Sequence, residues 1–167
     1  MAHITLDECV KFHGHLCSGL TAGYLLGLYA MELIGAQPGE ALFCRAEAKN
    51  CMIDGIQCVT GCTTGKGNLV INDIGKFAVT LVKSGTGKGV RVIADISSVP
   101  GETKPEIAKN LMNMDFKTLC KYTEVQIDVP AKKMSPSVVC DICGEKFSEN
   151  AARVQGGKIC CPDCADK

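Results

Sequence analysis

Residues 18–34 read SGLTAGYLLGLYAMELI, a stretch that any fold of this chain has to accommodate. A serine at its start and Gly35 at its end predict one long helix. Gly19, Gly23 and Gly27 recur along it at every fourth position and leave one face without side chains. Because each interior glycine costs roughly 1 kcal/mol of helix stability, we expect that face to pack closely against another helix or a sheet.

The composition describes a globular chain with no excess charge. The 167 residues are enough for one ordinary domain and a small appendage. There are 18 Lys and Arg against 18 Asp and Glu, so bulk charge indicates no nucleic-acid, membrane-surface or acidic partner. The apolar run at 20–34 is shorter than the roughly 18 residues of a membrane span, and it contains Glu32. We therefore expect no membrane segment.

Cysteine is the residue type that stands out. The chain has 12 cysteines, and its start, MAHITLDECV, lacks the basic and apolar regions of a secretion signal. These features predict a cytoplasmic protein in a reducing compartment. There, a dense set of thiols more often binds metal or performs redox chemistry than forms disulfides.

The segment FHGHLCSG at 12–19 carries three side chains of the kinds that bind metals. In one regular helix His13 and Cys17 would share a face and His15 would point away. If Gly14 breaks the helix and the next residues are extended, all three side chains project to one side. Imidazole and thiolate suit zinc or another borderline transition metal. The alternatives are a Cys17 thiolate activated by the histidines, or a polar turn with satisfied hydrogen bonds.

A second group is expected on a helix over residues 51–60. Cys51, Asp54 and Cys58 fall on one stripe of that helix, and Cys62 lies just beyond its end. A stripe of cysteines alone is typical of core packing. A buried carboxylate, however, needs a partner, and a metal, a cationic substrate group or one of the two histidines would supply it.

The loop GCTTGKGN at 61–68 has the glycines of a phosphate-binding loop but not their spacing. The Walker pattern needs four residues between its glycines and Ser or Thr after its lysine. Here three residues separate the glycines, and Gly67 follows Lys66. The loop is therefore interpreted as a glycine-rich lip that brings Lys66 toward an anionic ligand, or as a plain turn.

The remaining patterns alternate between short strands and helices. Strands are expected over 42–48, 68–72, 77–83, 90–95 and 123–129, and further helices over 6–12 and 105–119. This order favours an α+β fold, with helices packed on a mostly antiparallel sheet, over a repeating βαβ sheet. We expect a core domain at 1–130, a linker at 131–137 and a separate module at 138–167.

The C-terminal module holds two CxxC pairs: Cys140, Cys143, Cys161 and Cys164. This spacing can place four thiolates around one zinc ion, and so short a segment cannot fold on an apolar core alone. It predicts a structural zinc ribbon or treble clef with a hairpin that turns at Gly156-Gly157. Cys161 is preferred over Cys160 as the ligand because CPDC repeats the spacing of the first pair. The few basic residues are offset by acidic ones, so a protein partner is favoured over nucleic acid.

Taken together, these motifs resemble the FmdE family of formylmethanofuran dehydrogenase. The matching pieces are HGHLCSG at 13–19, the helix after it, CMIDGIQCVTGCTTGKGNL at 51–69, IGKFAV at 74–79, and CDICGE with CCPDC near the C-terminus. The resemblance implies an α+β core that forms homodimers, a cleft lined by the His/Cys motif, and an appended zinc finger. The cleft residues that it implies are His13, His15, Cys17, Cys51, Asp54, Cys62 and Lys66. Ser18 stands where the family usually has proline. The inclusion of Cys58 is supported by the helical stripe more than by the family resemblance.

The first functional hypothesis is a stand-alone protein of this type, whose cleft binds zinc or another transition metal and a small anionic substrate. The metal site would be built from His15, Cys17 and Cys62, with His13, Cys51 or Cys58 contributing. If the cleft is catalytic, the metal acts as a Lewis acid or holds a water, with Cys17 as ligand or nucleophile. Asp54 or His15 would carry protons and Lys66 would steer the substrate.

Two other hypotheses remain. The family takes its name from one component of a molybdenum or tungsten enzyme, and this chain has no pterin-binding or iron–sulfur pattern of its own. The chain could therefore be a non-enzymatic metal carrier, or an accessory or assembly subunit of such an oxidoreductase. The third hypothesis is an interaction or regulatory protein whose zinc finger binds nucleic acid, and the near-neutral charge of that module makes it the weakest of the three.

Overall fold

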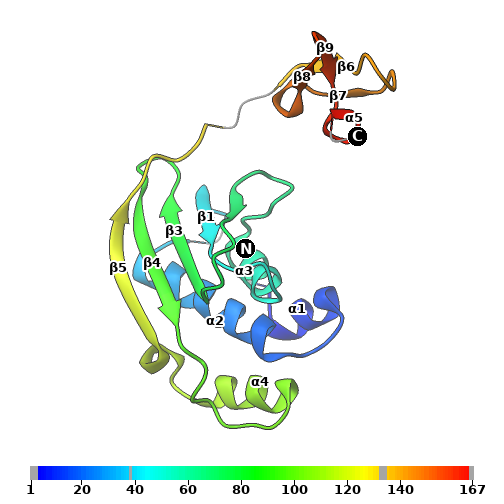
Figure 1. Ribbon diagram of the computed structural model, residues 1–167. Coiled ribbons are helices and arrows are strands. Elements are labelled where there is room, and N and C mark those ends of the chain that lie inside the picture. The colour runs from blue at the N-terminus through cyan, green and yellow to red at the C-terminus, as the bar shows by residue number, and fades with distance from the viewer. Residues whose placement is uncertain (1–3, 38, 132–134, 166–167) are drawn as a thin grey trace. The chain divides into compact units, whose positions relative to one another are not determined.

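The computed structural model describes residues 4–37, 39–131 and 135–165 (Figure 1). The chain forms two compact units, Met1–Val129 and Pro130–Lys167. Part of the linker expected at 131–137 lies outside the described residues, because these omit 132–134.

The larger unit contains a five-stranded sheet with helices on one face (Figure 1). Its strands are β1 (Leu42–Ala46), β2 (Leu69–Ile71), β3 (Ala78–Lys83), β4 (Lys88–Ala94) and β5 (Cys120–Gln126). They lie in the order β2-β1-β3-β4-β5, with β1 and β2 parallel and every other pair antiparallel. The α+β fold expected from the sequence is confirmed, including the mostly antiparallel sheet.

Capping residues and glycines set the helix boundaries. The helices are α1 (Leu6–His13), α2 (Ser18–Leu33), α3 (Met52–Thr60), α4 (Lys104–Asn113) and the 3₁₀ turn η1 (Phe116–Leu119). Thr5 and Thr103 begin α1 and α4 with capping boxes, in which each threonine and a glutamate satisfy each other's backbone N–H groups. Gly61 ends α3 in left-handed backbone, with φ 66°.

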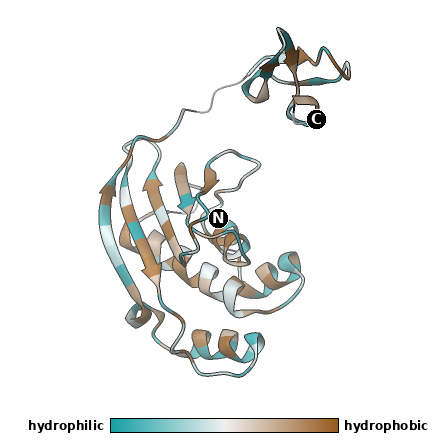
Figure 2. Cartoon of the chain, in the orientation of Figure 1, coloured by the Kyte–Doolittle hydropathy of each residue, from teal (hydrophilic) through white to brown (hydrophobic). Residues whose placement is uncertain are grey.

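The core between helices and sheet is aliphatic. Cys44 of β1 lies opposite Leu81 of β3, and Leu81 lies opposite Val90 of β4, so these side chains share one face of the sheet. They belong to one buried cluster that also contains Leu26 of α2 and Ile56 of α3. Figure 2 shows the apolar colouring along β3, which is buried from its first residue to its fifth.

The glycine face of α2 packs on α3, as expected. A Cβ atom at Gly23 would lie 2.1 Å from the carbonyl oxygen of Met52. Likewise, a Cβ atom at Gly55 of α3 would lie 2.3 Å from the carbonyl oxygen of Leu20 in α2. The two backbones therefore touch directly, and the start of α3 is held against the start of α2.

Several expected boundaries were wrong by part of an element. The helix expected at 105–119 ends at Asn113, because Met114 is extended and Asp115 starts a new turn by accepting a hydrogen bond from the Lys117 N–H. The strand expected at 123–129 covers Cys120–Gln126 instead. The strand expected at 42–48 ends at Ala46, because the Glu47 carbonyl turns to accept from the N–H groups of Ile74 and Lys76.

The C-terminal unit consists of two small hairpins and a short helix. Its elements are β6 (Ser137–Val139), β7 (Lys146–Ser148), the 3₁₀ turn η2 (Glu149–Ala151), β8 (Arg153–Gln155), β9 (Lys158–Cys160) and α5 (Pro162–Ala165). The β8–β9 hairpin turns at Gly156 and Gly157, as expected, and their φ values of 58° and 76° suit glycine. In the described parts of the chain, no helix has the length and apolar character needed to cross a membrane.

Candidate metal centre

The candidate core site begins where α1 ends. Gly14 adopts left-handed backbone (φ 96°, ψ −15°), and its N–H donates to the Val10 carbonyl at 2.8 Å. This turn brings His15 back beside His13, with 4.7 Å between the ring centroids. The sequence allowed either one continuous helix or a break at Gly14, and the structure has the break.

Two cysteines of the site occupy helix starts. Cys17 is the N-cap of α2, and its Sγ accepts a hydrogen bond from the Leu20 N–H at 3.4 Å. Cys51 is the N-cap of α3. The N-terminal ends of two helices, where the helix dipoles are positive, therefore converge on these thiols.

Packing of α2 on α3 brings the two cysteines together. A Cβ atom at Gly19 would lie only 3.1 Å from the Cβ of Cys51. A larger residue at position 19 would push Cys51 away from Cys17. Burial raises the pKa of the Cys51 thiol and the adjacent Cys17 thiol raises it further, while the charge of Lys104 opposes the rise.

Four predicted ligands meet at this point. One ligand atom from each of His13, His15, Cys17 and Cys51 lies within 4.8 Å of the others. The Cys17 Sγ and the His13 Nε2 are 3.8 Å apart. Around a tetrahedral zinc ion with bonds of about 2.0–2.3 Å, ligand atoms are roughly 3.3–3.8 Å apart. Small side-chain adjustments would therefore let this donor set enclose a zinc-sized ion.

Asp54 fixes the orientation of His13. The His13 Nδ1 lies 2.6 Å from the Asp54 Oδ2. An ionised carboxylate only accepts hydrogen bonds, so Nδ1 must carry the hydrogen and donate it. The lone pair of His13 is then on Nε2, which faces Cys17. A carboxylate behind a histidine is the usual support for a metal-binding imidazole.

The other expected members of the cleft do not join this group of ligand atoms. Cys58 packs with Cys9 in a buried cluster that also contains Cys17 and Leu20 of α2, but its Sγ is not among the converging ligand atoms. Seven residues at about 1.5 Å per residue place it roughly 10 Å along the helix from Cys51, too far to share an ion. Cys62 is fully buried beside the sheet, where its Sγ donates to the Leu42 carbonyl at 3.5 Å and burial raises its pKa to about 11.

Lys66 also differs from its expected place. Its Nζ donates to the Gly61 carbonyl at 3.0 Å, within its own loop, instead of reaching the cluster. The loop is a compact turn, in which the Lys66 N–H donates to the Thr63 hydroxyl and the Gly67 N–H to the Thr64 carbonyl. The plain-turn interpretation therefore describes it better than an anion-binding lip.

Three residues near the site were not singled out from the sequence. Cys9 is buried, and this burial raises its pKa. It stands four residues before His13 on α1, a spacing that could have been noticed. Gln57 stands three residues after Asp54 and donates to its Oδ1 at 3.3 Å. Lys104 begins α4, and its charge opposes the rise in the pKa of Cys51; no local sequence pattern indicates this influence, because it depends on the tertiary fold.

The C-terminal quartet forms a second group. One ligand atom from each of Cys140, Cys143, Cys161 and Cys164 lies within 4.8 Å of the others. The backbone N–H groups of Cys143 and Cys161 lower the pKa of the Cys140 thiol to about 6, which prepares it as a thiolate ligand. Cys160 is not in the group, and its Sγ donates to the Lys158 carbonyl at 3.7 Å.

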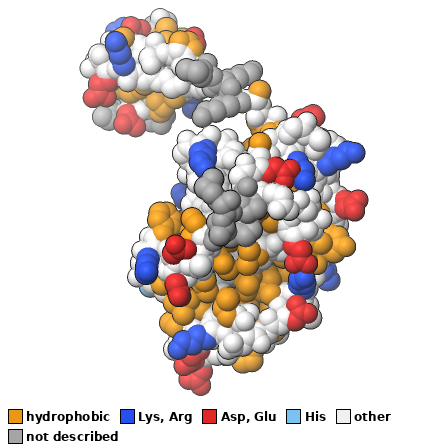
Figure 3. Space-filling view, turned by 180° about the vertical axis from the view of Figure 1, so that it is seen from behind, with side chains coloured by type: hydrophobic (Ala, Val, Ile, Leu, Met, Phe, Trp, Pro, Cys, Tyr) orange, Lys and Arg blue, Asp and Glu red, His pale blue; other side chains and the backbone are white. Residues whose placement is uncertain are grey.

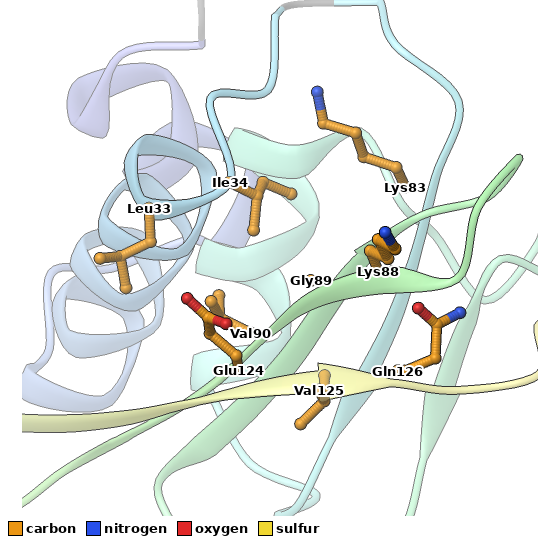
Figure 4. A pocket seen from close by; sticks show the side chains of 9 residues that line it. All are labelled: Leu33, Ile34, Lys83, Lys88, Gly89, Val90, Glu124, Val125 and Gln126. Atoms are coloured by element: carbon orange, nitrogen blue, oxygen red, sulfur yellow. The ribbon is translucent and has the colours of Figure 1, made fainter.

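Two cavities lie in the larger unit. One, of about 500 Å³, lies between Leu33 and Ile34 at the end of α2 and the strands β4 and β5 (Figure 4). None of the site residues expected from the sequence lines it. Another, of about 560 Å³, lies between α1 and α3, and among its walls are Phe12, Gln57 and Cys58.

The sequence matches a family model and a known protein. Residues 12–136 match the family model described as FmdE, Molybdenum formylmethanofuran dehydrogenase operon. A protein of Archaeoglobus fulgidus described as a probable S-adenosyl-L-methionine-binding protein is 39% identical over 95 residues. That match covers 53% of this chain and 26% of the relative, so the chain spans about a quarter of the relative's length.

A solved structure has the same fold over the whole chain. It is the crystal structure of a tungsten formylmethanofuran dehydrogenase FmdE-like protein from Syntrophus aciditrophicus. The TM-score is 0.65 at 24% sequence identity, and the match covers 99% of this chain and 97% of the other. At this identity the likeness concerns the fold.

Proposed function

The chain belongs to the FmdE family, and we propose from this premise that it is a zinc protein with two different sites. One observation carries the proposal: the ligand atoms of His13, His15, Cys17 and Cys51 lie within 4.8 Å of one another. The four C-terminal cysteines form a second, separate group that meets the same distance limit. The core group would bind the functional metal. The quartet would hold a structural zinc ion.

The core ligands suit a metal ion that a substrate can reach more than a fully buried structural ion. Cys17 is buried and His13 and Cys51 are half-buried, whereas His15 is exposed. The first three would hold the ion, and His15 would be the ligand that a substrate can replace. A zinc ion there would supply a Lewis acid. His15, once free, would accept or deliver a proton at its ring nitrogen, while Asp54 keeps the His13 Nε2 aimed at the site.

The substrate in this proposal is a small anion. Lys66, the cation expected to attract it, is engaged with the Gly61 carbonyl. The charge of Lys104, in contrast, acts on the Cys51 thiol. We therefore assign the attraction of the anion to Lys104.

A second candidate is a metal carrier or accessory subunit of a molybdenum or tungsten oxidoreductase. The descriptions of the matching family and of the Syntrophus protein both name formylmethanofuran dehydrogenase. A carrier would release its core metal quickly to a chelator and would bind a larger partner. A catalytic protein would retain the metal and turn over a substrate alone.

The proposed protein is a homodimer, and its compartment is a reducing cytoplasm. Figure 3 shows hydrophobic side chains gathered over part of one face of the larger unit. Contiguous exposed apolar surface of this kind often marks a protein interface, and light scattering would measure the mass of the assembly. A reducing compartment would keep the thiols available as ligands.

Metal analysis of the full-length chain tests the two sites separately. Cys51→Ser should lose one equivalent of zinc, and Cys143→Ser should lose a different one, because each removes a ligand from one group. Cys62→Ser is the matched control, since its side chain lies outside both groups and can still donate to the Leu42 carbonyl. A core site is excluded if Cys51→Ser retains all the zinc of the wild-type protein.

A further inference from the structure

A chain of hydrogen bonds runs from the loop after α3 to the core cluster. The backbone N–H of Thr64 donates to the Gln57 Oε1 at 3.3 Å. The Gln57 Nε2 donates to the Asp54 Oδ1 at 3.3 Å. The other carboxylate oxygen, Oδ2, accepts from the His13 Nδ1 at 2.6 Å. Two side chains, those of Gln57 and Asp54, and one backbone amide thus connect the loop to the imidazole.

This series of hydrogen bonds requires an amide side chain at position 57. Its oxygen end meets an N–H group, which needs an acceptor, and its nitrogen end meets a carboxylate, which needs a donor. Glutamate could accept from Thr64 but could not donate to Asp54. Leucine could do neither. Only a side chain with an acceptor and a donor at its tip satisfies both neighbours.

Asp54 needs this second anchor because it is not enclosed. Its side chain is 32% exposed, whereas that of His13 is 10% exposed. A partly solvated carboxylate can rotate and exchange its partners for water. The bond from Gln57 holds one oxygen, which leaves the other oxygen directed at His13.

We propose that Gln57 is a positioning residue of the core metal site. It acts through Asp54 to fix the tautomer and the ring orientation of His13, and it ties both to the loop at Thr64. The role of these hydrogen bonds in metal binding rests on the proposed function, but their effect on the His13 tautomer does not. Loss of a support of this kind typically costs 10–100-fold in metal affinity.

The first experiment reads the tautomer without metal. Nitrogen-15 spectra of the apo protein at about pH 8.5, well above the ordinary imidazole pKa of about 6.5, distinguish Nδ1–H from Nε2–H. Wild-type His13 should be the Nδ1–H form. Both Gln57→Leu and Gln57→Glu should give a mixture, because neither holds the Asp54 carboxylate.

The second experiment reads metal affinity with cobalt(II), whose absorption bands report thiolate and imidazole ligation. The full-length chain carries Cys143→Ser, so that the C-terminal group does not compete. Each change at Gln57 should weaken cobalt binding about tenfold. Gln126→Leu is the matched control, because Gln126 also donates from its amide, to the Thr86 carbonyl at 2.7 Å, but on β5. It should leave cobalt binding and the His13 tautomer unchanged.

The outcomes separate this proposal from the proposed function. If wild-type core thiols bind no cobalt, the metal site is wrong, and the tautomer still tests whether Gln57 positions His13. If His13 remains wholly Nδ1–H in both Gln57 variants, the positioning role is wrong, whatever the metal does. A tenfold loss in Gln57→Leu without a loss in Gln57→Glu would also overturn it, because the Thr64 contact alone would then carry the effect.

Discussion

At the scale of single residues, the two lysines considered for the core site differ in what they can do. Lys66 is turned back onto its own loop. Lys104 lies at the start of α4, and its charge opposes the rise in the pKa of Cys51. Its charge should therefore attract anions to the core thiols, most strongly at low ionic strength.

A pair of alkylating reagents tests this role of Lys104. Iodoacetate is an anion and iodoacetamide is neutral, and both react with thiolates. Lys104→Ala should lower the ratio of their rates at Cys51 in the metal-free protein about twofold at low salt, as followed by mass spectrometry. Lys66→Ala should leave the ratio unchanged. An equal ratio in wild type and Lys104→Ala would remove Lys104 from the substrate proposal.

At the scale of elements, the α2–α3 pair determines the site. Cys17 and Cys51 are the N-caps of these two helices, and direct backbone contact at Gly23 and Gly55 sets their separation. A change that separates the helices should therefore affect both stability and the cluster.

Gly55→Ala is the direct test of this contact. A methyl group there would lie 2.3 Å from the Leu20 carbonyl oxygen and 2.4 Å from the Tyr24 nitrogen, backbone atoms that cannot move aside. Overpacking costs about 1–3 kcal/mol, so urea denaturation should show a loss of about 2 kcal/mol in the free energy of unfolding. Gly85→Ala is the control, because a Cβ atom there meets nothing within 4 Å and φ is not positive. A stability equal to wild type in Gly55→Ala would contradict the close contact.

Local signals in the sequence predicted the elements well and the site in part. Thr5, Gly14, Gly61 and the glycine face of α2 act through neighbouring backbone, so their effects could be recognised from the sequence. The stripe of Cys51, Asp54 and Cys58 was harder to interpret, because periodicity identifies a face but not what faces it. Cys51 and Asp54 meet the histidines, while Cys58, one to two turns later, meets Cys9.

Contacts between distant segments were beyond prediction from sequence. Cys62 is expected in the cleft from the family resemblance and from its place after the helix, but its side chain is buried in the core, where its Sγ donates to the Leu42 carbonyl. The charge of Lys104 acts on Cys51, although more than fifty positions separate the two residues in the sequence. Such placements depend on tertiary packing, which no local pattern records.

At the scale of the whole molecule, the two units depend on different sources of stability. The larger unit has an extensive apolar core. The C-terminal unit contributes only Cys140 and Cys160 to the buried apolar residues of the described chain. Metal binding should therefore supply most of its folding free energy.

Chelation of the full-length chain should then unfold one unit and spare the other. Amide resonances of β6 to β9 should collapse toward random-coil positions, while those of β1 to β5 persist. The neighbouring pair Cys160 and Cys161 provides a matched comparison, because only Cys161 belongs to the quartet. Cys161→Ser should mimic chelation and Cys160→Ser should not. Collapse in both variants would show that the ligand is wrongly assigned or that the region needs both thiols.

The two donor sets would also give their complexes different formal charges. A zinc ion with two thiolates and two neutral imidazoles is electrically neutral, which suits a site where Cys17 is buried. A zinc ion with four thiolates carries two negative charges, which suits a quartet that includes the exposed Cys143. An anion that displaced His15 would give the core complex one negative charge, and Lys104 is placed to balance it.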